Sequence, residues 1–314
     1  MASEKLRTIR RYLFRNARPL DVARWDYHFE DAPVQGILKT LACYQNPDGG
    51  FGHGLEPDIR TAESNPMSTW TATRLLREAG LPDMARHMVD KTLDYLESTL
   101  NDNDKWPATT AAHNRDLHAP WFDHLEDEAF WGWNPTIELA AFILLTGEHR
   151  PALYTRAEGI VKAALPEIMD PDFIPAANEL SNIAEAAAIL LEIRPELLPE
   201  GFTDHLMRLL EQMVNDDSDA YDGDDYIVTP DFVMNSPESP WYPAIREVAD
   251  FYADYLENSV TDAGYWEIRW NWGDQEFPPD SVRDWRGSLI MEHMLYLQHF
   301  KPEQDEAGNF LKRT

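Results

Sequence analysis

The chain has almost nothing that would hold it together covalently. Cys43 is the single cysteine among 314 residues, which excludes a disulfide framework and any zinc site built from several thiolates. Such cysteine usage suits a reducing compartment, so we expect a cytoplasmic protein. Because Cys43 falls inside a helical run, we expect it to be buried and to act as a small hydrophobic side chain.

Positive charge is also scarce. The 27 Lys and Arg residues stand against 56 Asp and Glu residues, which gives a formal net charge of −29 and a pI near 4.5. This charge repels nucleic acid and anionic membranes, so neither is an expected partner. The first residues lack the apolar core of a signal peptide. The most apolar run, Leu139 to Leu145, is too short to span a bilayer.

Common cofactor and nucleophile motifs are missing from the chain. It contains no Gly-x-Gly-x-x-Gly or Walker A loop, no Gly-x-Ser-x-Gly elbow and no His-Glu-x-x-His pair. His113, His118 and His124 are close in sequence, but their spacing does not place them on one helical face. We therefore expect neither a cofactor nor a metal ion.

The most informative segment lies between Tyr44 and Trp70. A helical run ends near its start, and four glycines follow within six residues: Gly49, Gly50, Gly52 and Gly54. This density indicates backbone that needs positive φ or very close approach to other atoms. A new helix is expected to begin at Asn65-Pro66, an N-cap residue followed by a first-turn proline. Asn134-Pro135 repeats this pattern.

Part of this segment resembles a known repeat. Gln45, Asp48, Gly49, Gly50 and Phe51 are similar to the repeat motif of the squalene-cyclase and protein-prenyltransferase superfamily, whose members fold as α/α toroids. In that superfamily the glutamine and the aromatic residue tie one helix end to the next hairpin. The resemblance therefore implies structural roles for Gln45, Gly49, Gly50 and Phe51. It supports a fold more strongly than a reaction.

Two sorts of helix alternate along the chain. Segments 135–147, 182–193 and 288–297 are apolar almost all round, which requires protein on every side. Segments 88–100, 206–213 and 248–256 instead carry a single apolar stripe. Striped helices outside and apolar helices inside are what a double ring requires. We expect an all-α protein with an α/α toroid of five to six hairpins, forming one domain over residues 1–314.

The glycine-dense segment also carries more ionisable groups than a turn requires. His53, Glu56 and Asp58 stand within six positions, and together they could perform general acid–base chemistry if the loop folds them together. Arg60 is a candidate ligand-binding residue. The alternative is structural: Glu56, Asp58 and Glu63 would pair with Arg60 and cap the helix that begins at Pro66.

Aromatic residues gather just before the predicted inner helices. Their rings would line a cavity mouth, where they stack on sugar faces or stabilise a carbocation. The residues expected there are Trp121, Trp131, Trp133 and Trp272. For any single tryptophan, a place in the core is the alternative. Four charged residues are interleaved with them, as in the clefts of helical-barrel glycan enzymes: Asp123, Glu138, Arg269 and Asp274.

One string matches a cyclase motif literally. Class II terpene cyclases protonate an alkene with an Asp-x-Asp-Asp motif, and the chain contains Asp222-Gly223-Asp224-Asp225. The surrounding residues are rich in Asp and Asn beside a glycine, as expected for a solvated acidic loop. A chance match is common in so acidic a chain.

Three functions follow from these patterns. The first is an enzyme acting on an apolar, isoprenoid-type small molecule in the centre of the toroid, with His53, Glu56 and Asp58 handling protons. The second is a glycan-active hydrolase or lyase with a carboxylate pair, Asp58 and Asp123. The third is a toroid that binds a ligand without catalysis, because a fold by itself constrains activity poorly.

Overall fold

The structure is a computed structural model that describes residues 3–123, 129–222, 226–273 and 278–301. These residues form helices joined by loops, with isolated β-bridges and no strand among them. The all-α class expected from the sequence is confirmed. Among the helices described, none combines the length and the apolar character that crossing a bilayer needs.

The chain divides into two compact units. Unit 1 comprises residues 1–41 and 210–314, and unit 2 comprises residues 42–209. The helices of unit 1 are α1 (Ser3–Asn16), α2 (Pro19–Phe29), α3 (Gln35–Leu41), α10 (Tyr242–Ser259) and α11 (Pro279–Phe300). Those of unit 2 are α4 (Pro66–Glu78), α5 (Arg86–Thr99), α6 (Thr136–Thr146), α7 (Pro151–Ile168) and α8 (Ala177–Ile193). The boundary falls within α9 (Phe202–Met213).

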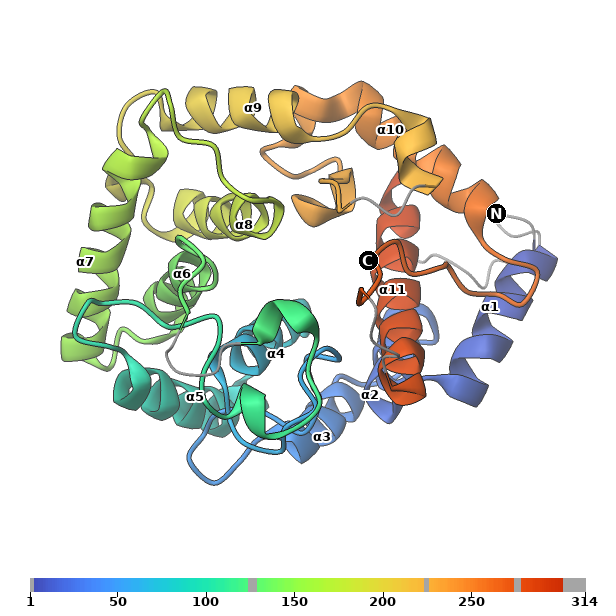
Figure 1. The fold of residues 1–314 in the computed structure, drawn as a ribbon, viewed down its shortest axis with the longest axis horizontal. Helices are drawn as coiled ribbons and strands as arrows, with labels where there is room; N and C mark the ends of the chain where they lie inside the picture. The colour runs from blue at the N-terminus through green and yellow to red at the C-terminus, as the bar shows by residue number, and fades with distance from the viewer. Residues whose placement is uncertain (1–2, 124–128, 223–225, 274–277, 302–314) are drawn as a thin grey trace. The chain divides into compact units, whose positions relative to one another are not determined.

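In unit 2 the most apolar helix lies at the centre of the packing. Every residue from Thr136 to Leu144 of α6 is buried, and α6 contacts α4, α7 and α8. Figure 1 shows α6 beside both α7 and α8. In contrast, α5 buries a single stripe that includes Val89, Leu93 and Leu96. The distinction between apolar and striped helices in this unit is therefore confirmed.

Unit 1 is built around α11, which contacts α1, α2 and α10 (Figure 1). Its core is strongly aromatic and includes Trp25, Tyr252, Trp266 and Tyr296. From Gly287 to Leu297 every residue except Glu292 is buried, so segment 288–297 is surrounded by protein on nearly all sides, as expected. Aromatic rings bury large apolar areas, so this cluster is a major source of the stability of the unit.

A buried charge also connects α2 to α11. Asp21 is fully buried and accepts hydrogen bonds from Arg18 Nε at 2.9 Å and Arg24 Nη1 at 3.4 Å. Arg18 Nη2 donates in turn to Ser288 Oγ at 2.7 Å. A Cβ atom on Gly287 would lie 2.8 Å from Asp21 Oδ2. The glycine therefore lets α11 pass close to the carboxylate.

The start of α4 was predicted correctly, whereas the start of α6 was not. Asn65 Oδ1 accepts the Ser68 N–H at 2.8 Å, and Pro66 occupies the first turn of α4. Helix α6 begins at Thr136 instead, and its N-cap position makes no side-chain cap hydrogen bond. Asn134 Oδ1 is used differently: it accepts from Asn182 Nδ2 at 3.2 Å.

The prediction that Cys43 is buried is wrong. Helix α3 ends at Leu41, and Cys43 lies in the 3-10 turn Ala42–Tyr44 that follows it. In this turn Cys43 is exposed.

Candidate functional site

The residues of the expected repeat motif hold the glycine-dense loop against α5. Gln45 Nε2 donates to Gly49 O at 3.0 Å and to Met88 O on α5 at 3.1 Å. Phe51 is fully buried. The amide of Gln45 thus ties the glycine-dense loop to α5.

Two glycines of this loop are required by close contacts. Gly49 has φ of 93°, and a Cβ atom there would lie 1.9 Å from Lys91 O. A Cβ on Gly50 would lie 2.5 Å from the Tyr95 ring. Real side chains do not tolerate such distances, so both glycines allow the loop to pack directly onto α5.

The three residues expected to handle protons differ in burial. His53 is exposed at φ of 57°, and its Nε2 lies 2.9 Å from Asn46 Oδ1. Glu56 and Asp58 are only 7% and 3% exposed. Glu56 Oε2 lies 3.5 Å from Thr71 Oγ1 on α4. The two carboxylates therefore lie inside the unit, with Glu56 next to α4, and the imidazole lies at its surface.

The expected structural alternative for this segment is wrong at Glu63 and at the helix cap. Glu63 pairs with Arg115 at 2.5 Å, and both side chains are more than half exposed. Asn65, and none of the acidic residues, supplies the side-chain cap of α4. The guanidinium of Arg60 lies against Gly54, where a Cβ atom would be 3.0 Å away.

The segment that contains Asp58 runs beside the segment that leads to Trp121. Ala119 N–H donates to Asp58 O at 2.8 Å, and Arg60 N–H donates to Leu117 O at 2.9 Å. Trp121 and Asp123 follow within this second segment, and both side chains are exposed. The structure therefore brings most of the candidate residues of unit 2 into two adjoining loops.

The remaining candidate tryptophans have different environments. Trp131 is half-buried and stacks on Phe122, with ring centroids 5.2 Å apart. Trp133 is 6% exposed, and its Nε1 donates to Glu167 Oε2 on α7 at 3.0 Å. Trp272 belongs to unit 1. Of Trp131, Trp133 and Trp272, only Trp131 lies in unit 2 and is also partly open to solvent.

The carboxylate of Glu179 packs against the backbone of Gly132 and Trp133, which requires a glycine at position 132. The backbone N–H of Trp133 donates to Glu179 Oε1 on α8 at 2.7 Å, while a Cβ atom on Gly132 would lie 2.0 Å from the same oxygen. Burial raises the pKa of the Glu179 carboxyl, although the hydrogen bond from Trp133 opposes this shift. This carboxylate fixes the loop before α6 onto α8.

The loop that leads to Trp121 contains a buried histidine, His113, that the sequence analysis did not assign to the acid–base site. His113 is fully buried, and its Nδ1 accepts the Thr110 N–H at 3.3 Å. Burial lowers the pKa of His113 to about 4, with a smaller contribution from His118. His113 is therefore neutral at pH 7. Among the described residues its Nε2 has no hydrogen-bond partner.

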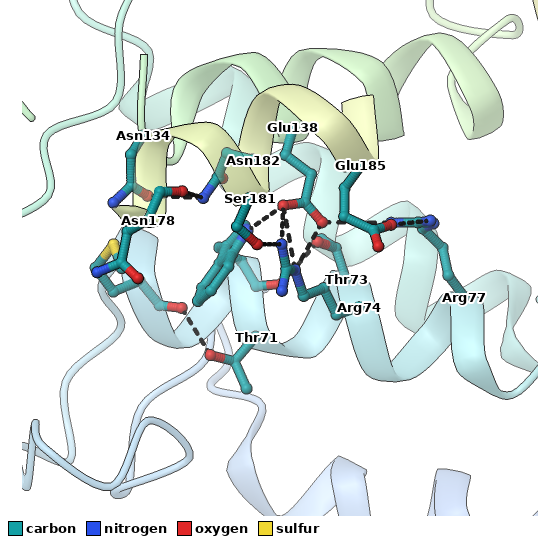
Figure 2. A network of polar contacts seen from close by, with 12 residues as sticks. Thr71, Thr73, Arg74, Arg77, Asn134, Glu138, Asn178, Ser181, Asn182 and Glu185 are labelled. Atoms are coloured by element: carbon teal, nitrogen blue, oxygen red, sulfur yellow. Dashed lines mark hydrogen bonds and ion pairs between the residues drawn. The ribbon is translucent and has the colours of Figure 1, made fainter. Parts of the chain in front are cut away.

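The most developed polar arrangement in unit 2 surrounds Glu138 of α6. We call it the Glu138 network, and its members are Trp70, Arg74 and Arg77 of α4, Glu138 of α6, and Ser181 and Glu185 of α8. Spacings of four and three residues place the α4 members on one face of that helix, and the same holds for the two on α8. Figure 2 shows the side chains of Arg74, Arg77, Glu138, Ser181 and Glu185 directed toward one another between the three helices.

Glu138 is 1% exposed and is bonded on both oxygens. Arg74 reaches it with two parallel bonds, Nε to Oε1 at 2.9 Å and Nη2 to Oε2 at 2.8 Å. Trp70 Nε1 donates to Oε2 at 2.7 Å, and Arg77 Nη1 to Oε1 at 3.3 Å. Charge-assisted, bidentate pairs of this type are the strong ones in proteins. Glu138 is thus a fully satisfied buried anion that orients the α4 side chains.

The outer members of the network remain partly open to solvent. Arg74 and Arg77 retain 32% and 22% side-chain exposure, and Glu185 retains 29%. Arg77 Nη2 donates to Glu185 Oε2 at 2.8 Å. Desolvation raises the pKa of Glu185, but the charges of Arg77 and Arg74 outweigh it and hold that pKa below its ordinary value. Unit 2 therefore presents a pre-oriented polar face.

Sequence reasoning identified only Glu138 among the members of this network. The members of the network lie far apart in the sequence: Arg74 bonds Glu138 and Ser181, which are 64 and 107 positions further along the chain. A usable signal was present in α6 itself. A lone carboxylate in an otherwise apolar, fully buried helix needs paired donors from its neighbours.

Some expectations fall elsewhere. His124, Asp274 and residues 223–225 of the acidic Asp-Gly-Asp-Asp string lie outside the described residues. Within the described ranges, no three His, Cys, Asp or Glu side chains converge in a way that would hold a metal ion.

In comparisons with known proteins, the chain matches no protein-family model and no curated protein. The resemblance to the squalene-cyclase superfamily therefore stays a prediction.

Proposed function

We propose that unit 2 binds a hydroxyl-rich, glycan-type ligand on the face of α4, α6 and α8, and that Glu56 and Asp58 act on it. The observation that carries this proposal is the half-open Glu138 network. Arginine and carboxylate groups held in fixed directions offer both donors and acceptors to sugar hydroxyls. Trp70 lies in the same face and is partly exposed.

An apolar ligand fits this face less well. It would remove water from Arg74 and Arg77 without replacing the hydrogen bonds that water makes, and such desolvation is costly. A polyhydroxylated ligand replaces those bonds. This comparison favours the glycan hypothesis over the isoprenoid one. The polar face of α4, α6 and α8 does not depend on closure of the helices into a toroid, which stays a prediction.

The buried carboxylate of Glu56 lies beside α4, and the buried Asp58 follows it two residues along the chain. Glu56 contacts Thr71, the residue next to Trp70 on α4, at 3.5 Å, and its other oxygen lies 3.5 Å from the Asp58 N–H. In glycoside hydrolysis one carboxylic acid protonates the leaving oxygen while the other, ionised, assists the attacking water. Glu56 and Asp58 are the pair we assign to these tasks, and Asp123, on the adjoining loop, is the alternative partner of Asp58.

Calorimetric titration with neutral oligosaccharides and with isoprenoid alcohols tests the binding step. The expected result is saturable binding of an oligosaccharide and none of the alcohols. Arg74→Lys, which loses the parallel bonds but keeps the charge, is expected to weaken the binding at least tenfold. A preference for the isoprenoid alcohols would overturn the proposal and favour the activity that the superfamily resemblance implies.

Turnover is tested separately with the oligosaccharide that binds. Glu56→Gln and Asp58→Asn should each lower the rate at least a hundredfold, as for a lost acid or base, without lowering the melting temperature. Glu63→Gln is the matched control, because Glu63 lies in the same loop and its side chain is 52% exposed. If Glu56→Gln and Asp58→Asn both unfold the protein, or if the control loses activity equally, the two carboxylates are structural.

A further inference from the structure

Unit 1 contains a second cluster of charged and hydroxyl groups, which the proposed function does not use. We call it the Asp231 cluster, and its members are Thr229, Asp231, Tyr252, Arg269 and His293. The residues come from two loops and from helices α10 and α11. Asp231 accepts from Thr229 Oγ1 at 2.5 Å and from Tyr252 OH at 3.1 Å.

Arg269 does not pair with Asp231 in the usual manner. Its Nη2 donates to Thr229 Oγ1 at 3.1 Å and to Tyr252 OH at 3.3 Å. Each hydroxyl accepts from the guanidinium and donates to the carboxylate, so two hydroxyls stand between the opposite charges. Structural Arg–Asp pairs frequently form two direct parallel bonds. Here the fork of Arg269 is left with capacity for another acceptor.

That capacity is visible at one atom. Nη1 of Arg269 is buried and, among the described residues, has no hydrogen-bond partner. An unsatisfied buried donor costs about 1–3 kcal/mol, and more when it is charged. Such groups in native proteins are satisfied by a water, an ion or a ligand. Nη1 is therefore the point at which an acceptor is missing.

His293 is the second group in the cluster with unused capacity. It is 3% exposed, and its Nε2 lies 3.4 Å from Asp231 Oδ2. Among the described residues neither ring nitrogen, Nδ1 or Nε2, makes a hydrogen bond, so both have capacity for a partner. The charged groups acting on His293 are Asp231 and Arg269, and the Trp266 ring packs against it.

The protonation state of His293 is set by opposing effects. Burial lowers its pKa and Arg269 lowers it further, while Asp231 opposes both. Burial also acts to raise the pKa of Asp231, but His293, Arg269 and Thr229 outweigh it and bring that pKa to about 2. With Asp231 ionised, Arg269 charged and His293 neutral, the cluster carries no net charge at neutral pH.

We propose that the Asp231 cluster is a binding site for a small oxyanion, held by Nη1 of Arg269, and that His293 takes up one proton from solvent as the anion binds. With one added proton, the occupied site is neutral overall for a singly charged oxyanion such as acetate, and it carries one net negative charge for sulfate. The chemistry is common to free inorganic anions and to the carboxylate of an organic acid. Because all members lie in unit 1, this site is independent of the function proposed for unit 2.

Sulfate is the first probe, because it does not titrate between pH 5.5 and pH 8. Calorimetry at constant ionic strength, with chloride as the balancing anion, should show saturable binding at one site. Acetate at pH 7 forms the second arm: competition with sulfate identifies a site that also takes organic acids, and its absence restricts the site to inorganic anions. Binding that does not saturate in either arm would overturn the proposal.

Two variants separate the roles of the residues. Arg269→Lys should weaken sulfate binding at least tenfold, whereas Arg10→Lys should not, because Arg10 is already paired with Glu30. The wild-type affinity should rise by up to tenfold for each pH unit below 8, since binding is linked to uptake of a proton. In His293→Gln this pH dependence should disappear. Equal binding by wild type and Arg269→Lys contradicts the assignment.

A crystal structure of the wild-type protein grown with sulfate provides a test that does not depend on any variant folding. Tetrahedral density within hydrogen-bond distance of Arg269 Nη1 is the expected result. A water molecule at that position, in crystals with saturating sulfate, would show that Nη1 is satisfied by solvent and would overturn the proposal.

Discussion

Replacing Glu138 by Gln should destabilise the protein by about 3 kcal/mol. The substitution keeps the size of the side chain but removes the charge that Arg74 and Arg77 share, and it points an amide N–H₂ group toward their donors. Breaking a fully buried ion pair costs about 3–5 kcal/mol. Because the two arginines are 32% and 22% exposed, water recovers part of this, and we expect the lower end of the range.

Urea unfolding followed by circular dichroism and tryptophan fluorescence measures this change. Asp104→Asn is the matched control, because Asp104 also lies in unit 2 and accepts a 2.6 Å bond from an arginine, Arg156. Both side chains of that pair are about half exposed, so the control should cost less than about 1 kcal/mol. It removes the same unit of charge from an acidic protein and therefore corrects for the change in net charge.

A double-mutant cycle identifies the interaction itself. Arg74→Met removes the partner that makes the parallel bonds, and Glu138→Gln combined with Arg74→Met should cost less than the sum of the two single changes by about 2 kcal/mol. A loss below about 0.5 kcal/mol in Glu138→Gln, or strict additivity in the cycle, would refute the view that Glu138 organises α4 by its charge.

Two further outcomes follow from the loops. Gly49→Ala should destabilise the protein by more than about 3 kcal/mol, because its Cβ atom would lie 1.9 Å from Lys91 O. Gly80→Ala is the control: it is also at positive φ, but a Cβ atom there meets no atom within 4 Å, so it should cost only about 1 kcal/mol. Equal losses of stability in thermal unfolding would contradict the contact argument. The pKa of His113 near 4 lies below the ordinary 6.5, so the unfolded chain binds a proton first and stability falls as pH drops from 6.5 to 4. The gap corresponds to about 3 kcal/mol, and His113→Gln should flatten the measured stability profile over that range; an unchanged profile would show that other groups are responsible.

The type of each helix could be predicted from its own residues. Segment 135–147 has no polar face, so burial on all sides was its only stable arrangement. In the structure, α6 is buried on all sides from Thr136 to Leu144. Asn65 and Pro66 define the start of α4 by local chemistry alone. Asn134-Pro135 shows the same two residue types and fails as a cap, because Asn182, far along the chain, takes the side-chain oxygen. Local patterns therefore decide an element until a distant partner competes for the same atom.

The candidate sites were harder to predict for the same reason. The glycine-dense loop was found because its residues are contiguous, and Glu56 and Asp58 were found with it. The Glu138 network joins three helices, and its arginines look like ordinary solvated residues in the sequence. The Asp231 cluster is assembled from four segments between Thr229 and His293. Such groups come within bonding distance only in the folded protein, and their spacing in the sequence does not predict that they meet.

The outward position of Cys43 has a practical consequence. As the sole sulfhydryl of the chain, and an exposed one, it can accept a maleimide fluorophore or a spin label stoichiometrically, without engineered substitutions. A reporter attached there would stand two residues before Gln45, in the 3-10 turn that leads into the glycine-dense loop. Changes in its emission or mobility on adding an oligosaccharide would follow that loop directly in the unmodified sequence.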